Sequence, residues 1–344
     1  MNALFGLGQA LLLALDPERA HDLAVKSLEL GLYPRADAPD DKRLGQHLFG
    51  LDFPNPVGMA AGFDKDARVP RELLGMGFGF VEVGTLTPRA QPGNPKPRLF
   101  RLKEDRAIIN RLGFNNRGQV DAFERLQRCS RGIIGVNIGA NKDSADRIAD
   151  YVSGIGSLAQ VAHYLTVNIS SPNTPGLRGL QDQGALDELL AAIREARPVG
   201  GPPVFLKVAP DLGDGDAKRI VRAALDHGID ALVVANTTVS RPALQSRQAG
   251  ETGGLSGGPL KTLALDALRQ FRSASDGELP LIGVGGIANA DDAWQRVRAG
   301  ASLVQLYTAM VYHGPGIGRR IALGLAERLD RAGYANIADA VGSE

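Results

Sequence analysis

Side chains that could transfer a proton and bind a polar ligand are concentrated in residues 167–180, VNISSPNTPGLRGL. Asn168 and Asn173 offer amide donors and acceptors to a planar polar substrate, and the Ser171 hydroxyl could transfer a proton. The alternative is a turn of asparagine and serine residues that only ends a strand. Two amides and a hydroxyl in one short segment favour a catalytic site.

Two further groups of amide and hydroxyl side chains have a similar composition. The first consists of Asn110, Asn115 and Asn116, in the stretch INRLGFNN. The second consists of Asn236, Thr237 and Thr238, which follow an apolar run. Either group alone would indicate a turn. Three such groups at predicted strand ends or in a long insertion favour one shared site for a ligand with carbonyl and N–H edges.

Two lysines are candidates for binding an anion. Lys207 lies inside the predicted strand VFLKVAP, where its charge is costly to bury unless it meets an anion or a flavin ring. The alternative is a structural lysine–carboxylate pair in the core. Lys65, in AGFDKDA, follows another predicted strand, and simple exposure to solvent is the alternative for this loop residue.

The segment GVGGIANADDA, residues 283–293, combines glycines with the expected start of a helix. Backbone N–H groups at such a helix N-terminus can bind a phosphate. The segment also fits the dinucleotide pattern G-x-G-x-x-A, but Gln305 and Leu306 stand where an acidic residue is expected about 20 positions later. The string GLSGG, residues 254–258, fits the serine-hydrolase elbow, but no strand is predicted before it. We therefore expect a phosphorylated cofactor without a Rossmann fold.

The composition of the chain excludes several classes of protein. Its 39 basic and 38 acidic residues give a net charge of +1, which predicts no nucleic-acid partner. The one cysteine, Cys129, excludes an internal disulfide framework, and the five histidines form no H-E-x-x-H motif, so no metal site is expected. No apolar run approaches the roughly 20 residues needed to cross a bilayer.

Eight short apolar runs alternate with segments of helical periodicity, for example residues 185–197, 216–228 and 289–300. This alternation predicts an α/β fold with a parallel sheet, and eight repeats predict a closed (β/α)8 TIM barrel. Most runs end in polar or glycine residues, at the face where such barrels build active sites. The runs are VGMAAG from Val57, FVEVGT from Phe80, IIGVNIG from Ile133, YLTVNIS from Tyr164, VFLKVAP from Val204, ALVVANT from Ala231, LIGVGGI from Leu281 and LVQLYTA from Leu303.

Two segments fall outside the repeats. Residues 86–131 form an insertion rich in proline and arginine, far longer than the usual connection of about two to six residues, so we expect it to be functional. Residues 1–40 form an N-terminal arm, and residues 41–344 form the barrel domain. Apolar residues precede a break at Asp16-Pro17, and a second amphipathic helix runs to about Leu30, which predicts a helical hairpin. The apolar residues before the break are Leu4, Phe5, Leu7, Leu11, Leu12 and Leu15.

The hairpin allows two interpretations. A helical cap on a barrel would bury its apolar face completely, whereas an arm that lies on a membrane would leave leucines facing outward. We favour the membrane.

Taken together and in this order, the motifs resemble those of the class 2 dihydroorotate dehydrogenases, over nearly the whole chain from Leu15 to the run at Leu303. The resemblance implies an FMN-dependent enzyme that oxidises (S)-dihydroorotate to orotate with a quinone as electron acceptor, in de novo pyrimidine (UMP) biosynthesis. The matching pieces are LDPERAHDL, AAGFDKDA, EVGTLTPRAQPGNPKPRLFRL, INRLGFNN, GVNIGANKD, NISSPNTPGLR, ETGGLSGGPL, GVGGI and LVQLYTAMVYHGP.

By this resemblance, Ser171 is the base that removes a proton from C5 of dihydroorotate while C6 delivers hydride to N5 of FMN. The soluble class has a cysteine at this position, so the serine indicates class 2. Serine is a poor base unless hydrogen bonding and exclusion of water assist it. Thr174 and Phe114 match the residues of such a proton relay.

The resemblance also implies the binding residues. Ala235 stands where many relatives have threonine, so we expect one side-chain contact with FMN to be lost. The implied substrate contacts are Lys65, Asn110, Arg111, Leu112, Gly113, Phe114, Asn168, Asn173, Asn236 and Thr237. The implied FMN contacts are Ala61, Gly62, Phe63, Asp64, Lys65, Thr85, Asn137, Asn168, Lys207, Gly257, Gly285, Gly286, Tyr307 and Thr308.

The hairpin would form the quinone entrance, with His21 and Arg101 along the path to the flavin. A monomeric peripheral protein on the cytoplasmic face of a bacterial inner membrane is therefore expected. Two other functions stay open from the residues alone: an aldolase that uses Lys207 as a Schiff base without a flavin, and a non-catalytic barrel that binds membranes.

Overall fold

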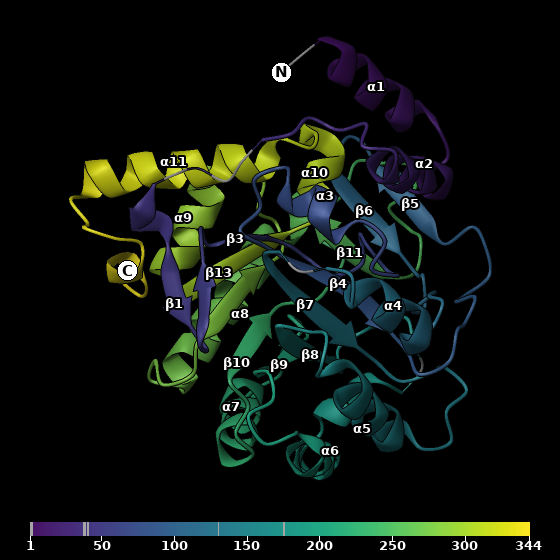
Figure 1. The fold of residues 1–344 in the computed structure, drawn as a ribbon, viewed down its shortest axis with the longest axis vertical. Helices are drawn as coiled ribbons and strands as arrows, with labels where there is room; N and C mark the ends of the chain where they lie inside the picture. Colours follow the sequence, from purple (N-terminus) through teal and green to yellow (C-terminus); the bar gives the residue numbers. More distant parts are fainter. Residues whose placement is uncertain (1–2, 37–38, 40, 130, 175) are drawn as a thin grey trace.

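The computed structural model describes residues 3–36, 39, 41–129, 131–174 and 176–344; the side chains of residues 3–7, 10 and 183 are outside this description. Parallel strands that these residues form close into a barrel, with helices around it (Figure 1). The prediction of a (β/α)8 barrel is confirmed. The barrel strands in chain order are β3 (Val57–Met59), β4 (Phe80–Leu86), β7 (Ile133–Ile138), β8 (Tyr164–Asn168), β9 (Val204–Val208), β10 (Ala231–Val234), β12 (Leu281–Val284) and β13 (Ala301–Leu306).

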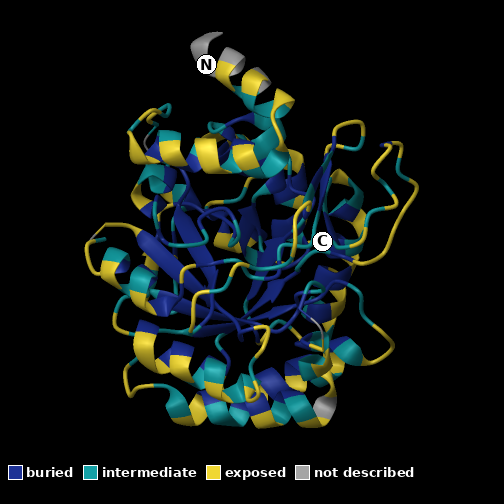
Figure 2. Cartoon of the chain, turned by 90° about the vertical axis from the view of Figure 1, so that its right-hand side faces the viewer, coloured by how far each residue is buried: buried dark blue, intermediate teal, exposed yellow. Residues whose placement is uncertain are grey.

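Each barrel strand is followed by a helix of the outer layer. These helices bury one apolar face against the outside of the barrel, and the strands themselves are buried on both faces (Figure 2). They are α3 (Pro70–Leu74), α4 (Gln119–Leu126), α5 (Arg147–Leu158), α6 (Gln183–Ala196), α7 (Asp216–Asp226), α8 (Lys261–Ala274), α9 (Ala290–Arg298) and α11 (Ile317–Ala332). A short helix, α10 (Thr308–His313), lies between β13 and α11.

Two small antiparallel sheets were not predicted from the sequence. The hairpin β1 (Gln46–Leu48) and β2 (Leu51–Phe53) packs its apolar residues against the interior of the barrel. The second sheet joins β5 (Leu99–Leu102) and β6 (Ala107–Asn110) of the long insertion to β11 (Gly254–Gly257). The string GLSGG therefore begins as a strand itself, paired with β6, and does not form a strand-to-helix elbow.

The inward face of the barrel is aromatic near the start of several strands. Phe80, Tyr164 and Phe205 belong to one buried cluster, in which the Tyr164 and Phe205 rings stack with their centroids 4.6 Å apart. Glycine on a neighbouring strand leaves room for a ring, since a Cβ at Gly135 would lie 2.0 Å from the Tyr164 ring. These rings fill the barrel, so ligands must bind above them.

Further along the same strands the inward face becomes polar. Side chains alternate between the two faces of a strand, so Glu82, Thr166 and Lys207 share the face of the three aromatic residues. Asn168 follows on the same face of β8. This change from aromatic to polar residues places the polar groups at the carboxyl ends of the strands, where active sites of this fold form.

The N-terminal arm consists of two successive helices, α1 (Ala3–Ala14) and α2 (Pro17–Glu29), as predicted. Asp16 caps α2, because its side chain accepts hydrogen bonds from the N–H groups of Glu18 and Arg19 at 3.1 and 3.0 Å. Val25 and Leu28 are buried in the main core. Of the apolar residues expected in the first helix, the side chains of Leu4, Phe5 and Leu7 lie outside the described part. No helix in the described part is long and apolar enough to cross a membrane.

Candidate active site

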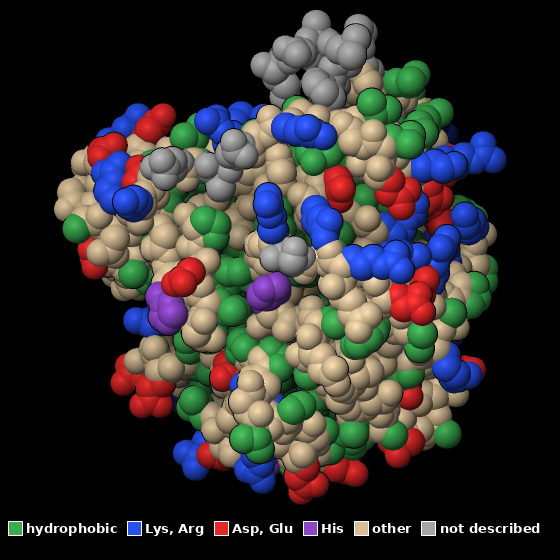
Figure 3. All heavy atoms as spheres, viewed as in Figure 1, with side chains coloured by type: hydrophobic (Ala, Val, Ile, Leu, Met, Phe, Trp, Pro, Cys, Tyr) green, Lys and Arg blue, Asp and Glu red, His purple; other side chains and the backbone are tan. Residues whose placement is uncertain are grey.

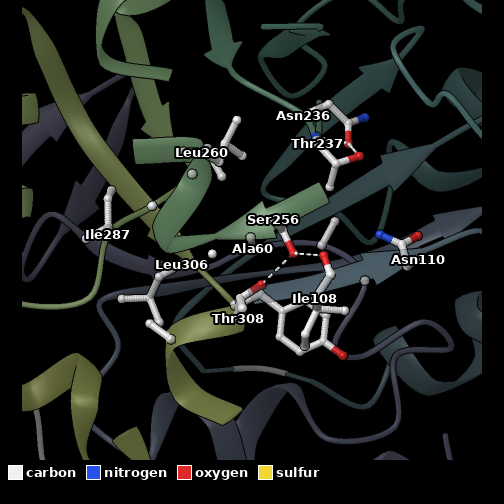
Figure 4. Close-up of a pocket in the computed structure, with 18 of the residues that line it drawn as sticks. Ala60, Ile108, Asn110, Asn236, Thr237, Ser256, Leu260, Ile287, Leu306 and Thr308 are labelled. Atoms are coloured by element: carbon white, nitrogen blue, oxygen red, sulfur yellow. Dashed lines mark hydrogen bonds between the residues drawn. The ribbon is translucent and has the colours of Figure 1, made fainter. Parts of the chain in front are cut away.

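A cavity of about 590 Å³ opens at the carboxyl ends of the barrel strands. Its walls come from barrel strand ends, from the β5–β6–β11 sheet and from α10 and α11. Figure 4 shows Asn110, Asn236 and Thr237 on one side of this cavity, and Leu260, Ile287 and Leu306 on another. Most of the site residues expected from the sequence line it: Ala61, Gly62, Lys65, Thr85, Asn110, Leu112, Gly113, Phe114, Asn168, Ser171, Asn173, Lys207, Asn236, Thr237, Gly257, Gly285, Gly286, Tyr307 and Thr308.

Members of all three amide groups line this cavity; Asn116 does not, because it is buried and donates to Thr87 Oγ1 at 2.8 Å. Asn236 donates through Nδ2 to Asn168 Oδ1 at 3.2 Å and to Ser170 Oγ at 3.0 Å. Asn173 donates through Nδ2 to Asn110 Oδ1 at 3.1 Å, which joins the loop after β8 to strand β6. Residues distant in sequence thus present amide edges to one space, as a ligand with carbonyl and N–H edges requires.

Ser171 lies at the cavity wall in an almost dry setting. Only 5% of the residue is exposed, and its Oγ accepts a hydrogen bond from the N–H of Asn173 at 3.3 Å. Thr174 is buried close by in sequence, and its Oγ1 has no hydrogen-bond partner in the described part of the chain. Phe114 lines the same cavity. A hydroxyl shielded from water has the surroundings that proton transfer by serine needs.

Lys65 connects the cavity to the N-terminal arm. Its ammonium can only donate, so it donates to His21 Nε2 at 3.0 Å, which leaves the proton of the neutral ring on Nδ1, 3.4 Å from the Tyr307 hydroxyl. Burial lowers the pKa of Lys65 to about 8. Burial, and next the Lys65 charge, hold the pKa of His21 well below its usual value. The imidazole is therefore neutral at pH 7.

Lys207 projects from β9 into the cavity and is only 6% exposed. Its ammonium forms no hydrogen bond or ion pair within the described residues. Burial lowers the pKa of Lys207, and the carboxylate of Glu82 opposes this shift. A buried cation that lacks a hydrogen-bonding partner is suited to an electron-rich ligand in the cavity.

A glycine-lined wall lies at another part of the cavity. Gly257, Gly285 and Gly286 have φ values of 95°, 104° and 71°, which disfavour other residues. A Cβ at Gly286 would lie 2.3 Å from the Cα of Lys261, so the backbone is closely packed there. Asn289, the N-cap of α9, also lines the cavity. Exposed backbone N–H groups beside a helix N-terminus form a suitable place for a phosphate.

A family model described as dihydroorotate dehydrogenase matches residues 43–329. The chain belongs to the dihydroorotate dehydrogenase family. Two relatives carry the name dihydroorotate dehydrogenase (quinone). The Erythrobacter litoralis protein is 61% identical over 99% of this chain and 100% of its own length, and the Novosphingobium aromaticivorans protein is 58% identical over 99% of both chains. This similarity places the chain in the quinone-dependent class 2.

A solved structure has the same fold. The crystal structure of DHODH from Eimeria tenella in complex with ferulenol is 41% identical, with a TM-score of 0.92 over 95% of each chain. Members of the dihydroorotate dehydrogenase family are flavoenzymes.

Several residues that the family resemblance implied lie outside the lining of the cavity. Asp64 is buried and accepts hydrogen bonds from the N–H groups of Arg68 and Val69, so it shapes the loop after β3. Phe63 packs edge-on against the His21 and Tyr307 rings. The rings of Phe63, His21 and Tyr307 therefore support the wall near Lys65. Figure 1 shows α2, which carries His21, at the upper right.

The remaining outlying residues bind other parts of the protein. Arg111 pairs with Glu251 at 2.7 Å, and Arg101 donates to the backbone oxygens of Leu13 and Leu15 at 3.0 and 3.2 Å. Asn137 is fully buried behind Thr85 and Asn168, both of which donate to its Oδ1. Arg101 therefore fastens the arm to β5, and Asn137 orients the residues in front of it.

Some residues of the site were missed by reasoning from the sequence. Arg178 donates to the backbone oxygens of Ser170 and Thr237 and pairs with Asp211 at 3.0 Å, so it holds the loop of Ser171 against the loop after β10. Ser256 lines the cavity and its hydroxyl lies 2.8 Å from that of Thr308 (Figure 4). The arginine in NTPGLR was a visible signal, because it is the charged residue of that motif. For Ser256 no local signal existed.

Arg296 was also missed. It is fully buried on α9 and donates through one nitrogen to the backbone oxygens of Gly285 at 2.8 Å and Lys261 at 2.6 Å. Burial lowers the pKa of Arg296 to about 10, so it remains charged at pH 7. This cation lies behind the glycine-lined wall. Among the described residues, no group of three or more histidine, cysteine, aspartate or glutamate side chains could hold a metal.

Proposed function

We propose that this chain oxidises (S)-dihydroorotate to orotate through FMN and delivers the electrons to a membrane quinone, as a step of pyrimidine (UMP) biosynthesis. The observation that carries the proposal is the convergence of Ser171 with the amides of Asn110, Asn168, Asn173 and Asn236 on one water-poor cavity. The membership of the quinone-dependent class supports the identity of both substrates.

The cavity suits FMN in two respects. Gly257, Gly285 and Gly286 line the cavity without side chains that would keep a phosphate from their backbone, and Arg296 lies behind them. Lys207 supplies a buried cation for the electron-rich ring. When bound, FMN would accept a hydride from the substrate and return electrons one or two at a time.

The chain's own residues would then do the rest. The Lys65 ammonium would attract the carboxylate of dihydroorotate, and the four asparagine amides would align its ring. Ser171 would take the proton from C5. Thr174 and Phe114 would form the path by which this proton leaves and would keep water out of that path. Thr174 Oγ1 lies in the same loop, has no hydrogen-bond partner among the described residues and can still accept a hydrogen bond.

The arm would receive the quinone. Hydrophobic side chains gather over the described end of α1 and over α2, with lysine and arginine side chains beside them (Figure 3). Leu11, Leu30 and Leu32 are 63%, 72% and 66% exposed, which favours a membrane-lying arm over a completely buried cap. His21, which contacts Lys65 of the cavity, and Arg101, which binds the backbone at the end of α1, would line the quinone path.

We further propose the division into an arm, residues 1–40, and a barrel domain, residues 41–344; residue 40 lies outside the described part. A monomer bound peripherally to the cytoplasmic face of a bacterial inner membrane agrees with these exposed leucines. No nucleic-acid partner is proposed.

Absorption spectroscopy of the purified protein tests the function. A yellow protein whose flavin band bleaches on anaerobic addition of dihydroorotate, and returns on addition of quinone, is expected. A colourless protein, or a yellow one whose spectrum dihydroorotate leaves unchanged, would contradict the proposal. A Schiff-base enzyme using Lys207 would be colourless and would be trapped by borohydride with its substrate.

A further inference from the structure

A carboxylate lies inside the barrel, behind the wall of the cavity. Glu82 of β4 is fully buried and accepts hydrogen bonds from Asn137 and Gln305 at 2.8 Å, and from Tyr164 and Thr166 at 3.2 Å. The donors come from β7, β8 and β13. In all four hydrogen bonds the neighbour is the donor, so each of these side chains directs a donor at the carboxyl oxygens of Glu82.

The direction imposed on Asn137 is passed on toward the cavity. Since its NH₂ group is used by Glu82, its Oδ1 must face the other way, where it accepts from Thr85 Oγ1 at 2.6 Å and Asn168 Nδ2 at 3.2 Å. Asn168 in turn directs its Oδ1 at Asn236 Nδ2, at 3.2 Å. Glu82 and the amides of Asn137, Asn168 and Asn236 therefore form one hydrogen-bonded chain. Each amide in it directs its NH₂ group toward the neighbour nearer Glu82.

The last two amides of this chain line the cavity, where Figure 4 shows Asn236 beside Thr237. An amide has a donor edge and an acceptor edge of nearly the same shape, so local packing alone does not choose between its two orientations. The buried carboxylate makes that choice for Asn137. At the cavity end, the backbone N–H groups of Ser170 and Thr237 donate to Asn168 Oδ1 at 3.3 Å and to Asn236 Oδ1 at 2.8 Å, so the chain is held in the same sense from both ends.

We propose that Glu82 is a positioning residue that sets the orientation of Asn137 and, through Asn137, holds Asn168 and Asn236 in the positions at which they offer their hydrogen-bonding edges to the ring of dihydroorotate and orotate. This inference rests on the proposed function. The ability of Glu82 to accept hydrogen bonds, and not its shape, determines recognition of the substrate ring.

Two variants separate acceptor character from shape. Glu82→Gln keeps the shape of glutamate but replaces one of its two acceptor oxygens with an NH₂ donor, so the four donors around it, of which Asn137 is one, compete for a single acceptor. Glu82→Asp is one methylene shorter but remains an acceptor only. Orotate binding to the full-length FMN enzyme would be measured by titration calorimetry.

We expect Glu82→Gln to weaken orotate binding by about 10- to 100-fold, the usual effect of unpaired buried polar groups. Glu82→Asp is expected to bind orotate more tightly than Glu82→Gln does. If Glu82→Gln binds as well as Glu82→Asp or better, shape is what matters and the inference is overturned. Failure of the parental enzyme to bind orotate would instead contradict the proposed function.

Thr166→Val is the matched control, because it removes one neutral donor to Glu82 and leaves the carboxylate in place. It should lower the melting temperature while orotate binding stays within about twofold of the parental value. A loss equal to that of Glu82→Gln would show that any disturbance of the core has this effect and would overturn the inference.

If Glu82→Gln does not yield soluble enzyme, Asn137→Leu interrupts the same chain one step nearer the cavity. At saturating FMN, this variant must also bind orotate at least about 10-fold more weakly. Orotate binding at the parental level in Asn137→Leu would overturn the inference.

Discussion

Four asparagine amides of the strand-end cavity are hydrogen-bonded in pairs, Asn173 with Asn110 and Asn236 with Asn168, whereas several leucines on the N-terminal arm are exposed. In the cavity, Asn236 donates to Asn168 and Ser170. On the arm, Leu30 and Leu32 are 72% and 66% exposed. Amides held in position before binding suit a small polar substrate, because little conformational freedom is then lost. Exposed leucines suit a partner with an extensive apolar surface, such as a membrane.

The two regions meet at His21, which contacts both Lys65 and Tyr307 of the cavity. His21 of the arm accepts from Lys65 of the cavity, and its ring packs against Phe63. The proposed sites for dihydroorotate and for quinone are therefore adjacent but built from different segments. Variants in one region should affect one half-reaction and spare the other.

The largest effect is expected from Ser171→Ala. If the cavity alone carries out dihydroorotate oxidation, loss of the proposed base should slow flavin reduction at least ~10²-fold, the usual scale for general-base loss, while yellow FMN is retained. Anaerobic stopped-flow absorbance measures the rate. Ser275→Ala, at a buried serine on the far end of α8, is the control and should reduce FMN at the parental rate. A near-parental rate in Ser171→Ala would remove Ser171 from the mechanism.

On the arm, a combined variant of Leu11→Gln, Leu30→Gln and Leu32→Gln removes exposed apolar surface without touching the buried face of α2. Turnover with a long-chain quinone in vesicles should fall about 10-fold or more, since each leucine contributes on the order of 1 kcal/mol or more to membrane binding. Reduction of FMN by dihydroorotate should be unchanged. Vesicle flotation and both half-reactions would be measured.

The matched control for the arm is Val120→Gln, Val199→Gln and Val239→Gln, at positions that are 74%, 107% and 51% exposed elsewhere on the surface. This variant should remain bound to vesicles. If the leucine variant also stays bound and turns over long-chain quinone normally, the arm is a structural cap. Deleting residues 1–35 would be a poorer test, because it would remove Val25 and Leu28 from the core.

Lys207→Met tests whether the barrel cation serves the cofactor or only the core. Loss of a charged contact should weaken FMN binding about 10-fold or more, measured by flavin fluorescence quenching with apoprotein. Lys218→Met, at an exposed lysine on α7, is the control. A Lys207→Met protein with a lowered melting temperature but parental FMN affinity and flavin reduction would favour the structural interpretation.

The smallest effect concerns pH. Burial lowers the pKa of Lys65 to about 8, so the free enzyme loses this cation as pH rises through that value. Affinity for the orotate anion should be constant below about pH 8 and decrease above it by up to ~10-fold per pH unit. Calorimetric titration from pH 6 to 9 measures this. Lys65→Gln should bind weakly without that inflection; an inflection that persists would assign it to another group.

Much of the site could be predicted because its signals are local. Ser171, Asn173 and Asn236 stand at the ends of strands whose β-branched runs are evident, and parallel strands bring their carboxyl ends to one face. The positions of Asn137 and Arg101 could not be predicted in the same way. Resemblance marks them as site residues, but the structure places one behind the cavity wall and uses the other to hold the arm.

The β5–β6–β11 sheet is a part of the fold that could not be predicted from the local sequence. Its strands are four residues each, and β11 pairs with β6 across more than a hundred residues of chain. Such short strands carry little periodicity, and the pairing partner is chosen only when the barrel brings them together. This sheet nevertheless contributes Asn110 and Ser256 to the cavity.

By itself, the sequence determined the eight-stranded barrel, the two-helix arm and the location of Ser171 and the amides at the strand ends, since periodicity, capping and motifs act over a few residues. Only the tertiary structure decided the role available to Glu82. Within FVEVGT it is one acidic residue of a strand, and nothing local tells whether it faces solvent or the barrel interior. Closure of the barrel turns it inward and brings donors from β7, β8 and β13 to it, and Gln305 is 223 positions away in sequence. A hydrogen-bonded chain from such distant partners exists only once the strands are in register.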